Sequence, residues 1–517
     1  HRGTYTTHGA VKAGNRELER LLFEAELWSL AAHRLTGAPV PADVLDASWK
    51  VLLLHQFHDI IPGSSIHWVY DDTLADYDRL RTEVGAVRDV ALGALAEHVD
   101  AGGATRPALV ANGLPFARDE LVDHDGTLVR ATAPACGWEV VDLDRPVDEL
   151  GPPVTSGHGW MDNGIIRVEW DGDGLLRSIV HHPTGREVVA EGAAANLLQL
   201  FDDEPADWDA WDIDAAALAT GVDLTEAEVV ELVEQHEDRA TLLVARSFGR
   251  SRIEQRVRLA RGSRRLEVHC EVDWHEDHKL LKVAFPLRVH TSVARHEIQF
   301  GHVDRPTHRN TSWDQARFET CAHTWVDLSE DSFGVALLND SKYGHKVKGH
   351  TIDLNLLRSV PYPGPRLVAD DAVAPGEPHP AYTDQADHAF RYALYPHAGD
   401  GLDAGVVRTA YEFNIPLQVV DATSHAGTMP PVESWLAVDR PEVVIETVKL
   451  AEQGDGLIVR AYETTGATVT AHVSAGIAVT GAEETDLLER SERAMDIADG
   501  TLPVDFRPFE IKTLRLR

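Results

Sequence analysis

The sequence predicts a multidomain protein of mixed α and β class, in which a three-helix bundle is followed by antiparallel β-sandwich domains. Apolar residues recur with helical spacing over roughly the first hundred positions. The chain then changes to short alternating segments punctuated by Gly, Asp and Pro, without helices between them, which favours antiparallel sandwiches over a doubly wound sheet. A length of 517 residues exceeds one hydrophobic core and indicates about three or four domains.

The charge balance limits the partners of the protein. Lys and Arg number 48 against 84 Asp and Glu, a net charge of -36, which argues against nucleic-acid and anionic-membrane partners and favours a neutral or polar substrate. Cys136, Cys270 and Cys321 lie far apart, which disfavours a disulfide framework or a thiolate zinc site and predicts a cytoplasmic setting. No apolar run reaches the roughly eighteen residues of a membrane span.

The first helix is expected to begin at Arg16, because residues 1–15 are polar, rich in Gly and Thr, and lack a helical period. We interpret those residues as a loop. The apolar residues that follow at helical spacing are Leu18, Leu21, Leu22, Ala25, Trp28 and Leu30. They indicate an amphipathic helix that ends near Gly37.

Two further helices complete the predicted bundle. One begins after Pro41, a residue favoured in a first turn, and runs towards His58. The other extends from about Tyr70 to Val99. Short connections between three helices predict an antiparallel arrangement over residues 1–104.

The remainder of the chain is predicted to be β-structure. Alternation is clear in Ile165–Trp170, Leu242–Ser247, Leu266–Trp274, Lys282–Val289 and Val335–Leu338, and a last segment spans Phe509–Leu516. Breaks at Gly151-Pro152-Pro153 and at Ser424–Pro431 suggest domain boundaries. The sequence therefore predicts a small β region at 105–153, a large sandwich at 154–425 and a C-terminal sandwich at 426–517.

His58 is the candidate ligand residue of the bundle. A histidine near the end of an apolar helix is most often a satisfied, partly buried residue. Asp59 follows it directly, however, and the Pro62-Gly63 turn would fix the helix end. His55 shares a helix face with His58 and could chelate a metal with it, although its apolar neighbours favour a place in the core.

Several segments carry a family resemblance in the same order along the chain. They are His1–Thr7 (HRGTYTT), His55–Ser64 (HQFHDIIPGS), Asp207–Asp214 (DWDAWDID), Phe300–Asp314 (FGHVDRPTHRNTSWD) and Leu337–Gly344 (LLNDSKYG). The set resembles the α-mannosidases of glycoside hydrolase family 38, particularly the cytosolic and bacterial branch.

The resemblance implies a retaining, zinc-dependent hydrolase of terminal α-mannosides. His58 matches the family's zinc ligand from the helical domain, and Asp59 matches a neighbour that contacts sugar hydroxyls. Zinc would serve chiefly as a template for the distorted sugar, while two carboxyl groups perform the displacement. Arg358 lies near the position of an arginine that reaches the active site in some relatives, and the alternative is an ordinary surface arginine.

The chain departs from the family pattern because it starts after the catalytic α/β domain. The nucleophile and the other zinc ligands have no counterpart, so we expect no catalytic residue here, weak zinc binding and no mannoside hydrolysis by the chain alone. We expect the missing α/β domain to be its partner. Apolar surface left without that domain could also lead to a homo-oligomer.

Other interpretations remain open at the level of sequence. A carbohydrate-binding or scaffolding protein with the same domains would share these patterns, and so would another retaining glycosidase with a similar C-terminal half. Asp207–Asp214 fits either a sugar-stacking loop or an acidic surface loop with two buried indoles. His302, His308 and Arg309 fit a polar cluster that braces domains.

Overall fold

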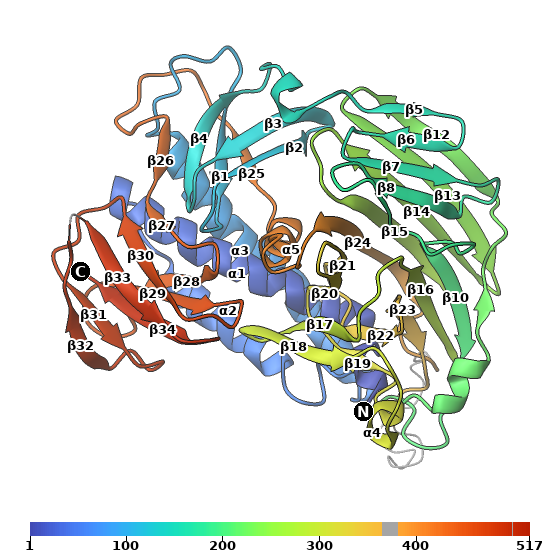
Figure 1. Cartoon of the computed structure of the whole chain (residues 1–517). Coiled ribbons are helices and arrows are strands. Elements are labelled where there is room, and N and C mark those ends of the chain that lie inside the picture. Colours follow the sequence, from blue (N-terminus) through green and yellow to red (C-terminus); the bar gives the residue numbers. More distant parts are fainter. Residues whose placement is uncertain (364–380, 499) are drawn as a thin grey trace.

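The computed structural model describes residues 1–363, 381–498 and 500–517. A long pair of helices runs through the middle of the molecule, with the large β-structure on one side and the C-terminal β-structure on the other (Figure 1). A small sheet lies at the upper end of the helices in that view. The predicted class, a helical N-terminal region followed by antiparallel sheets, is confirmed.

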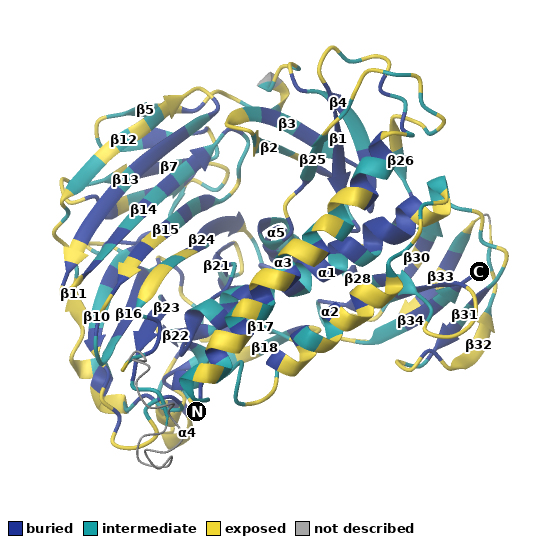
Figure 2. Ribbon diagram, turned by 180° about the vertical axis from the view of Figure 1, so that it is seen from behind, coloured by how far each residue is buried: buried dark blue, intermediate teal, exposed yellow. Residues whose placement is uncertain are grey.

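The helical region contains α1 (Gly9–Thr36), α2 (Ala42–His55) and α3 (His67–Ala96). Gly37 ends α1 in the left-handed region at φ 79°, where its N–H donates to the carbonyl of His33 at 3.0 Å. Their shared core consists of Val11, Leu18, Leu21, Leu22, Ala25, Leu45, Leu52, Tyr70, Tyr77, Leu80 and Val84. The outer faces of α2 and α3 carry the exposed residues (Figure 2).

The loop predicted for residues 1–15 is wrong in its second half. A short 3-10 turn, η1 (Gly3–Tyr5), is followed by α1 from Gly9 onward. The Asp384 carboxylate accepts the backbone N–H of Gly9 at 2.9 Å, so the helix start is capped by a residue distant in sequence. Position 14 of this helix requires glycine, because a methyl group there would lie 2.4 Å from the Tyr77 ring. Neither contact is visible as a local pattern.

The predicted extension of the second helix to His58 is also wrong. The helix α2 ends at His55, and Gln56 caps it. The Gln56 side-chain amide donates to Asn15 Oδ1 at 2.9 Å and to Glu19 Oε1 at 2.8 Å. This tie to α1 fixes the point at which the chain leaves the helix.

The large β-structure contains three antiparallel sheets. The strands of the five-stranded sheet are β5 (Thr155–Gly157), β6 (Trp160–Asp162), β7 (Ile166–Trp170), β8 (Leu176–His181) and β9 (Arg186–Glu187). The nine-stranded sheet has the order β12 (Val229–His236), β13 (Arg239–Phe248), β14 (Ser251–Ala260), β15 (Leu266–Trp274), β24 (Ala386–Ala398), β21 (Phe333–Asn339), β20 (Trp325–Glu330), β17 (Val293–Ile298), β18 (Gly301–Pro306). The six-stranded sheet has the order β11 (Val222–Asp223), β10 (Leu197–Asp202), β16 (Lys279–Pro286), β23 (Thr351–Ser359), β22 (Gly344–Lys348), β19 (Thr320–Cys321). One continuous apolar core lies between these sheets.

The small β region and the C-terminal region are interleaved. The four-stranded sheet has the order β25 (Gln418–Asp421), β1 (Pro107–Asn112), β4 (Gly137–Asp142), β26 (Val432–Ser434), next to the hairpin β2 (Arg118–His124) and β3 (Thr127–Ala133). The C-terminal region has two sheets. The three-stranded sheet has the order β27 (Leu436–Val438), β30 (Val469–Ala475), β33 (Thr501–Phe506). The five-stranded sheet has the order β28 (Val443–Leu450), β29 (Leu457–Glu463), β34 (Ile511–Leu516), β31 (Ala482–Thr485), β32 (Ser491–Met495). Short helices are η2 (Asp148–Leu150), η3 (Ala215–Ala219), α4 (Ser312–Ala316) and α5 (Val406–Asn414).

The predicted strands are present, with small shifts at their ends, and Leu266–Trp274 has the expected bounds. The domain boundaries at 105–153, 154–425 and 426–517 stay a prediction. The four-stranded sheet takes strands from all three of these ranges, so its strands do not follow the sequence divisions. Within the described residues, no helix combines the length and the apolar character needed to cross a bilayer.

Candidate functional site

The predicted metal-binding residue, His58, lies in a tight turn just after α2. The N–H of Ile60 donates to the carbonyl of Phe57 at 3.0 Å, and the N–H of Gly63 donates to that of Ile60 at 3.0 Å. Gly63 has φ +87°, and a methyl group there would lie 2.6 Å from the carbonyl oxygen of Thr7. Glycine is therefore required, because the turn packs directly against the N-terminal segment.

The side chains of His58 and Asp59 point outward from a fixed main chain. The His58 side chain is 78% exposed and the Asp59 side chain 42%, with Nε2 and Oδ2 3.5 Å apart. The Tyr70 hydroxyl donates to the backbone carbonyl of Asp59 at 3.1 Å, which fixes the main chain of the turn. An imidazole and a carboxylate are thus presented side by side to whatever lies outside this surface.

His55 does not share that role. It is buried, with its Nε2 2.9 Å from Asp76 Oδ2 and its Nδ1 3.1 Å from Thr73 Oγ1. Both ring nitrogens are occupied, so the alternative of a chelate formed by His55 and His58 is wrong. The interpretation of His55 as a core residue is the one that the structure supports.

A buried lysine ties the turn to the first helix. Lys12 of α1 donates from Nζ to the carbonyl of Thr7 and, at 2.8 Å, to that of Ile61. Burial lowers the pKa of Lys12 to about 7. Next to it, the His8 ring stacks on Tyr70 with centroids 3.6 Å apart. The sequence patterns did not single out Lys12 or Tyr70, because their role depends on tertiary contacts.

Arg358 contacts the same N-terminal segment. It is fully buried on β23 and forms an ion pair with Asp203, which is also fully buried. Its Nη1 donates to Thr7 Oγ1 at 2.8 Å, and its Nη2 donates to the carbonyl of Asp212. The alternative of a surface arginine is therefore wrong. A direct contact between Arg358 and substrate stays a prediction, since its guanidinium is bound to protein groups here.

Neither indole of the tryptophan loop Asp207–Asp214 is buried. Trp208 is 63% exposed and forms an edge contact with Trp211 at 5.6 Å between ring centroids. The Asp212 carboxylate pairs with Arg2 at 2.9 Å. Of the two readings of this loop, the one with two buried indoles is wrong, and sugar stacking stays a prediction.

The polar residues around Pro306 use separate partners. His302 packs edge-on against Phe509 of the C-terminal region, with centroids 5.1 Å apart. Arg309 instead donates to the carbonyl of Asp314 at 2.8 Å and to that of Arg317 at 2.5 Å. Bracing between domains is thus supported for His302, whereas Arg309 orders the loop around α4.

A three-donor group within ligand distance, among the described residues, consists of His124, Asp125 and Asp421, whose donor atoms lie within 4.8 Å of one another. It lies on the surface of the small β region. His58 and Asp59 belong to no such group in the described parts of the chain. The His58 turn can therefore contribute to a metal site without completing one.

The comparisons with known proteins agree with this architecture. Residues 1–95 match the alpha mannosidase middle domain, residues 161–366 the glycosyl hydrolases family 38 C-terminal domain, and residues 442–514 the family 38 C-terminal beta sandwich domain. The chain belongs to glycoside hydrolase family 38. The resemblance drawn from the sequence motifs is thereby confirmed.

Family 38 relatives extend beyond the length of this chain. Alpha-mannosidase 2C1 of Homo sapiens is 41% identical over 540 residues, covering 100% of this chain and 50% of the relative. Alpha-mannosidase G of Dictyostelium discoideum is 29% identical over 590 residues, covering 100% and 52%. The chain thus spans about half the length of these curated relatives.

A solved structure shows the same fold. An alpha-mannosidase from Enterococcus faecalis V583 superimposes with a TM-score of 0.82 at 18% identity, over 100% of this chain and 68% of that one. At 18% identity, this match shows only that the two chains share a fold.

Proposed function

We propose that this chain supplies the middle and C-terminal domains of a zinc-dependent α-mannosidase, which releases terminal α-mannosyl residues with retention of configuration in cytoplasmic carbohydrate catabolism. Membership of family 38 and the names of the relatives support the α-mannosidase class. The observation that carries the proposal is the outward pair of His58 and Asp59 on a turn whose main chain is fixed.

The groups on this turn fit one part of a zinc site. Zinc is usually bound by about four ligands. Among the described residues, the exposed His58 imidazole makes no closer polar contact than the one with Asp59 at 3.5 Å, so it is available to be one of these ligands. The Asp59 carboxylate is placed to accept hydrogen bonds from the hydroxyl groups of a sugar. Zinc, when bound, supplies a template for the sugar hydroxyls. The remaining ligands and the two carboxyl groups of a retaining hydrolase belong, in this proposal, to an α/β domain.

The surface around the turn supports such a partner domain. Leu53, Leu54 and Phe57 are 57%, 61% and 54% exposed, and Trp68 of α3 is 37% exposed. A cluster of large apolar side chains on a surface is typical of a surface covered by another domain. Association of two copies of the chain through the same surface would cover it as well, and the size of the purified particle distinguishes the two cases.

Arg358 is proposed to position the site rather than to act on substrate. It connects the N-terminal segment at Thr7 to the Asp203 side of the tryptophan loop. Gly63 of the His58 turn packs against the backbone of the same Thr7. A shift of Arg358 would therefore be transmitted to the metal-binding turn through Thr7.

The test compares the 517-residue chain with the same chain joined to a family 38 α/β domain. We expect the chain alone to purify without stoichiometric zinc and to leave an activated aryl α-mannoside intact, whereas the joined form hydrolyses it. His58→Ala in the joined form should remove the activity and the zinc. His236→Ala, an exposed histidine on β12, is the control and should change neither. Stoichiometric zinc or turnover in the chain alone, or activity that survives His58→Ala, would refute the proposal.

A further inference from the structure

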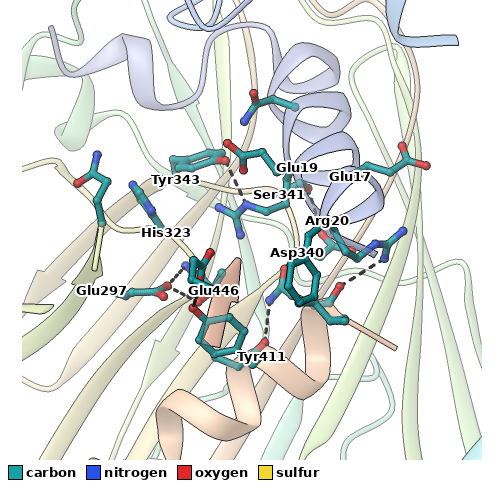
Figure 3. A pocket seen from close by; sticks show the side chains of 18 of the residues that line it. Glu17, Glu19, Arg20, Glu297, His323, Asp340, Ser341, Tyr343, Tyr411 and Glu446 are labelled. Atoms are coloured by element: carbon teal, nitrogen blue, oxygen red, sulfur yellow. Dashed lines mark hydrogen bonds between the residues drawn. The ribbon is translucent and has the colours of Figure 1, made fainter. Parts of the chain in front are cut away.

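A large cavity of about 810 Å³ lies between the helical region, the nine-stranded sheet and the C-terminal region (Figure 3). Its wall includes residues of α1, α2, β17, β24, α5, β28 and β29. His58, Asp59 and Arg358 are not among the lining residues. The cavity is large enough for a small organic ligand, and it lies where three regions of the chain meet, a common location for binding sites.

Several buried polar groups form part of the cavity wall. The Glu446 carboxylate accepts the Tyr411 hydroxyl at 2.6 Å, and that hydroxyl lies 2.9 Å from the hydroxyl of Tyr462. Burial raises the pKa of Glu446 to about 7 and also raises the pKa of Glu297 and of Glu19. The three carboxyl groups converge on the same space from α1, β17 and β28 (Figure 3).

Arg16 has unused hydrogen-bonding capacity in this wall. Its Nε donates to the Tyr343 hydroxyl at 3.2 Å. Its Nη1 and Nη2 are shut off from solvent and find no hydrogen-bond acceptor among the described residues. A buried donor without an acceptor is costly, so the guanidinium end calls for oxygen atoms supplied by something that enters the cavity.

The charges of the wall select the class of ligand. The cationic side chains are Arg16, Arg20 and Arg391, and the acidic ones are Glu17, Glu19, Glu26, Glu297, Asp340 and Glu446. An anion would be repelled by this excess of carboxylates. A cation would face the free end of Arg16. A neutral molecule with many hydroxyl groups satisfies both kinds of wall, because each hydroxyl can donate to a carboxylate and accept from a guanidinium.

Aromatic side chains complete this selection. Phe23, Trp49 and Phe300 also line the cavity, and Phe300 is 39% exposed at its edge. Aromatic rings offer apolar faces on which the carbon–hydrogen face of a sugar ring can pack. A cavity that combines such rings with carboxylates and an arginine whose two Nη atoms lack acceptors has the composition that a saccharide requires.

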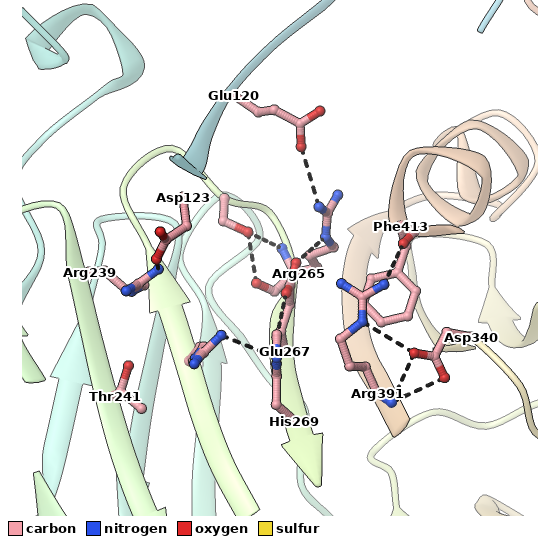
Figure 4. Close-up of polar contacts among 12 residues, drawn as sticks. Glu120, Asp123, Arg239, Thr241, Arg265, Glu267, His269, Asp340, Arg391 and Phe413 are labelled. Carbon is pink, nitrogen blue, oxygen red and sulfur yellow. Dashed lines mark hydrogen bonds and ion pairs between the residues drawn. The ribbon is translucent and has the colours of Figure 1, made fainter. Parts of the chain in front are cut away.

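A second, arginine-rich cavity provides a contrast. It holds about 160 Å³ near Arg265, whose Nε donates to Glu267 at 2.7 Å and whose Nη2 lies 3.5 Å from Glu120 (Figure 4). Arg391, on the wall of the larger cavity, likewise donates from Nε to Asp340 at 3.2 Å. Arg265 and Arg391 thus have acceptors. Among the described residues, Arg20, Arg246, Arg258 and Arg515 have a buried Nε without an acceptor, whereas Arg16 lacks acceptors at both Nη atoms.

We propose that the large cavity binds a neutral mono- or disaccharide, held by Arg16 at its hydroxyl oxygens and by the carboxylates of α1 and β17 at its hydroxyl protons. No bond is made or broken in this site. The proposal is independent of mannoside hydrolysis, and it would hold equally if the chain never took part in a hydrolase.

The first test blocks the mouth of the cavity. Ala389 on β24 is exposed and lines the cavity, whereas Ala386 on the same strand is exposed and does not. Saturation-transfer NMR and calorimetry are performed on the 517-residue chain in EDTA, with methyl α-mannoside, maltose, glucose 6-phosphate and spermidine as probes. We expect a neutral sugar to bind, Ala389→Trp to weaken that binding about tenfold or more, and Ala386→Trp to leave it unchanged.

The second test removes the unpaired donors. Arg16→Met should lower the affinity for the neutral sugar about tenfold. Arg79→Met on the exposed side of α3, away from the cavity, should not alter it. Failure of every neutral sugar to bind, preference for glucose 6-phosphate or spermidine, or binding unaffected by both Ala389→Trp and Arg16→Met would overturn the proposal. Because EDTA removes zinc, none of these results depends on the His58 turn.

Discussion

The His58 turn and the Arg358 ion pair lie against the same N-terminal segment, but the polar side chains of the turn are exposed and those of the ion pair are buried. Arg358 and Asp203 are fully buried, and the guanidinium is bound by protein groups alone. His58 keeps its ring in solvent while Tyr70 holds the main chain of the neighbouring Asp59. The difference separates two tasks. The buried pair fixes the segment, and the exposed pair remains available to a ligand.

The largest effect is expected when the buried side of this comparison is broken. Arg358→Met leaves the Asp203 carboxylate buried without its counter-charge, so the free energy of the first unfolding transition should fall by about 3–5 kcal/mol. Urea unfolding followed by tryptophan fluorescence measures it. Arg507→Met, which removes an arginine that is 80% exposed, is the control and should cost less than about 1 kcal/mol. Equal losses from both variants would show that burial does not set the strength of the Arg358 pair.

A smaller effect concerns Lys12, which joins the two sides. Burial lowers its pKa to about 7 in the folded chain, against 10.5 for an ordinary lysine. Between these values the unfolded chain binds more protons, so stability rises with pH. The stability of the natural chain relative to Lys12→Met should therefore increase by about 3.5 kcal/mol from pH 7 to pH 10, measured by urea unfolding at several pH values. A difference that stays constant or falls over this range would contradict the shift.

The smallest effect is expected on the exposed side. His58→Ala removes a side chain that is 78% exposed and should change the free energy of unfolding by less than about 0.5 kcal/mol. Thermal unfolding of the chain alone is the measurement. A loss as large as that of Arg358→Met would mean that His58 is a structural residue, and the comparison between the two sides would no longer hold.

The sequence was sufficient for the elements that depend on local pattern. Helical spacing and the glycine stop predicted the end of the first helix near Gly37, and alternation predicted Leu266–Trp274. The sequence was insufficient where a contact with a residue distant in sequence sets the end of a helix. The start of α1 at Gly9 depends on the Asp384 carboxylate, and the end of α2 depends on contacts of Gln56 with α1. A capping residue hundreds of positions away leaves no periodic signal.

The same division applies to the candidate site. His58 and Asp59 were found because they form part of a recognisable motif, and their exposure suits the role that the motif implies. The burial of Arg358 was missed, because a single arginine in a strand carries no sign of its partner Asp203. The sequence pattern marks Arg16 only as the start of an amphipathic helix, although its two Nη atoms have no acceptor in the cavity wall among the described residues.

The four-stranded sheet has a consequence for how the chain is made. One edge of β1 pairs with β4, which is synthesised about 25 residues later. The other edge pairs with β25, with Ala108 opposite Asp421, and β25 is synthesised about 300 residues later. At typical synthesis rates of about 5–20 residues per second, that edge stays open for roughly 15–60 s. An unpaired strand edge invites pairing with other chains. Chaperone protection during synthesis would therefore matter more for β1 than for the helices that precede it.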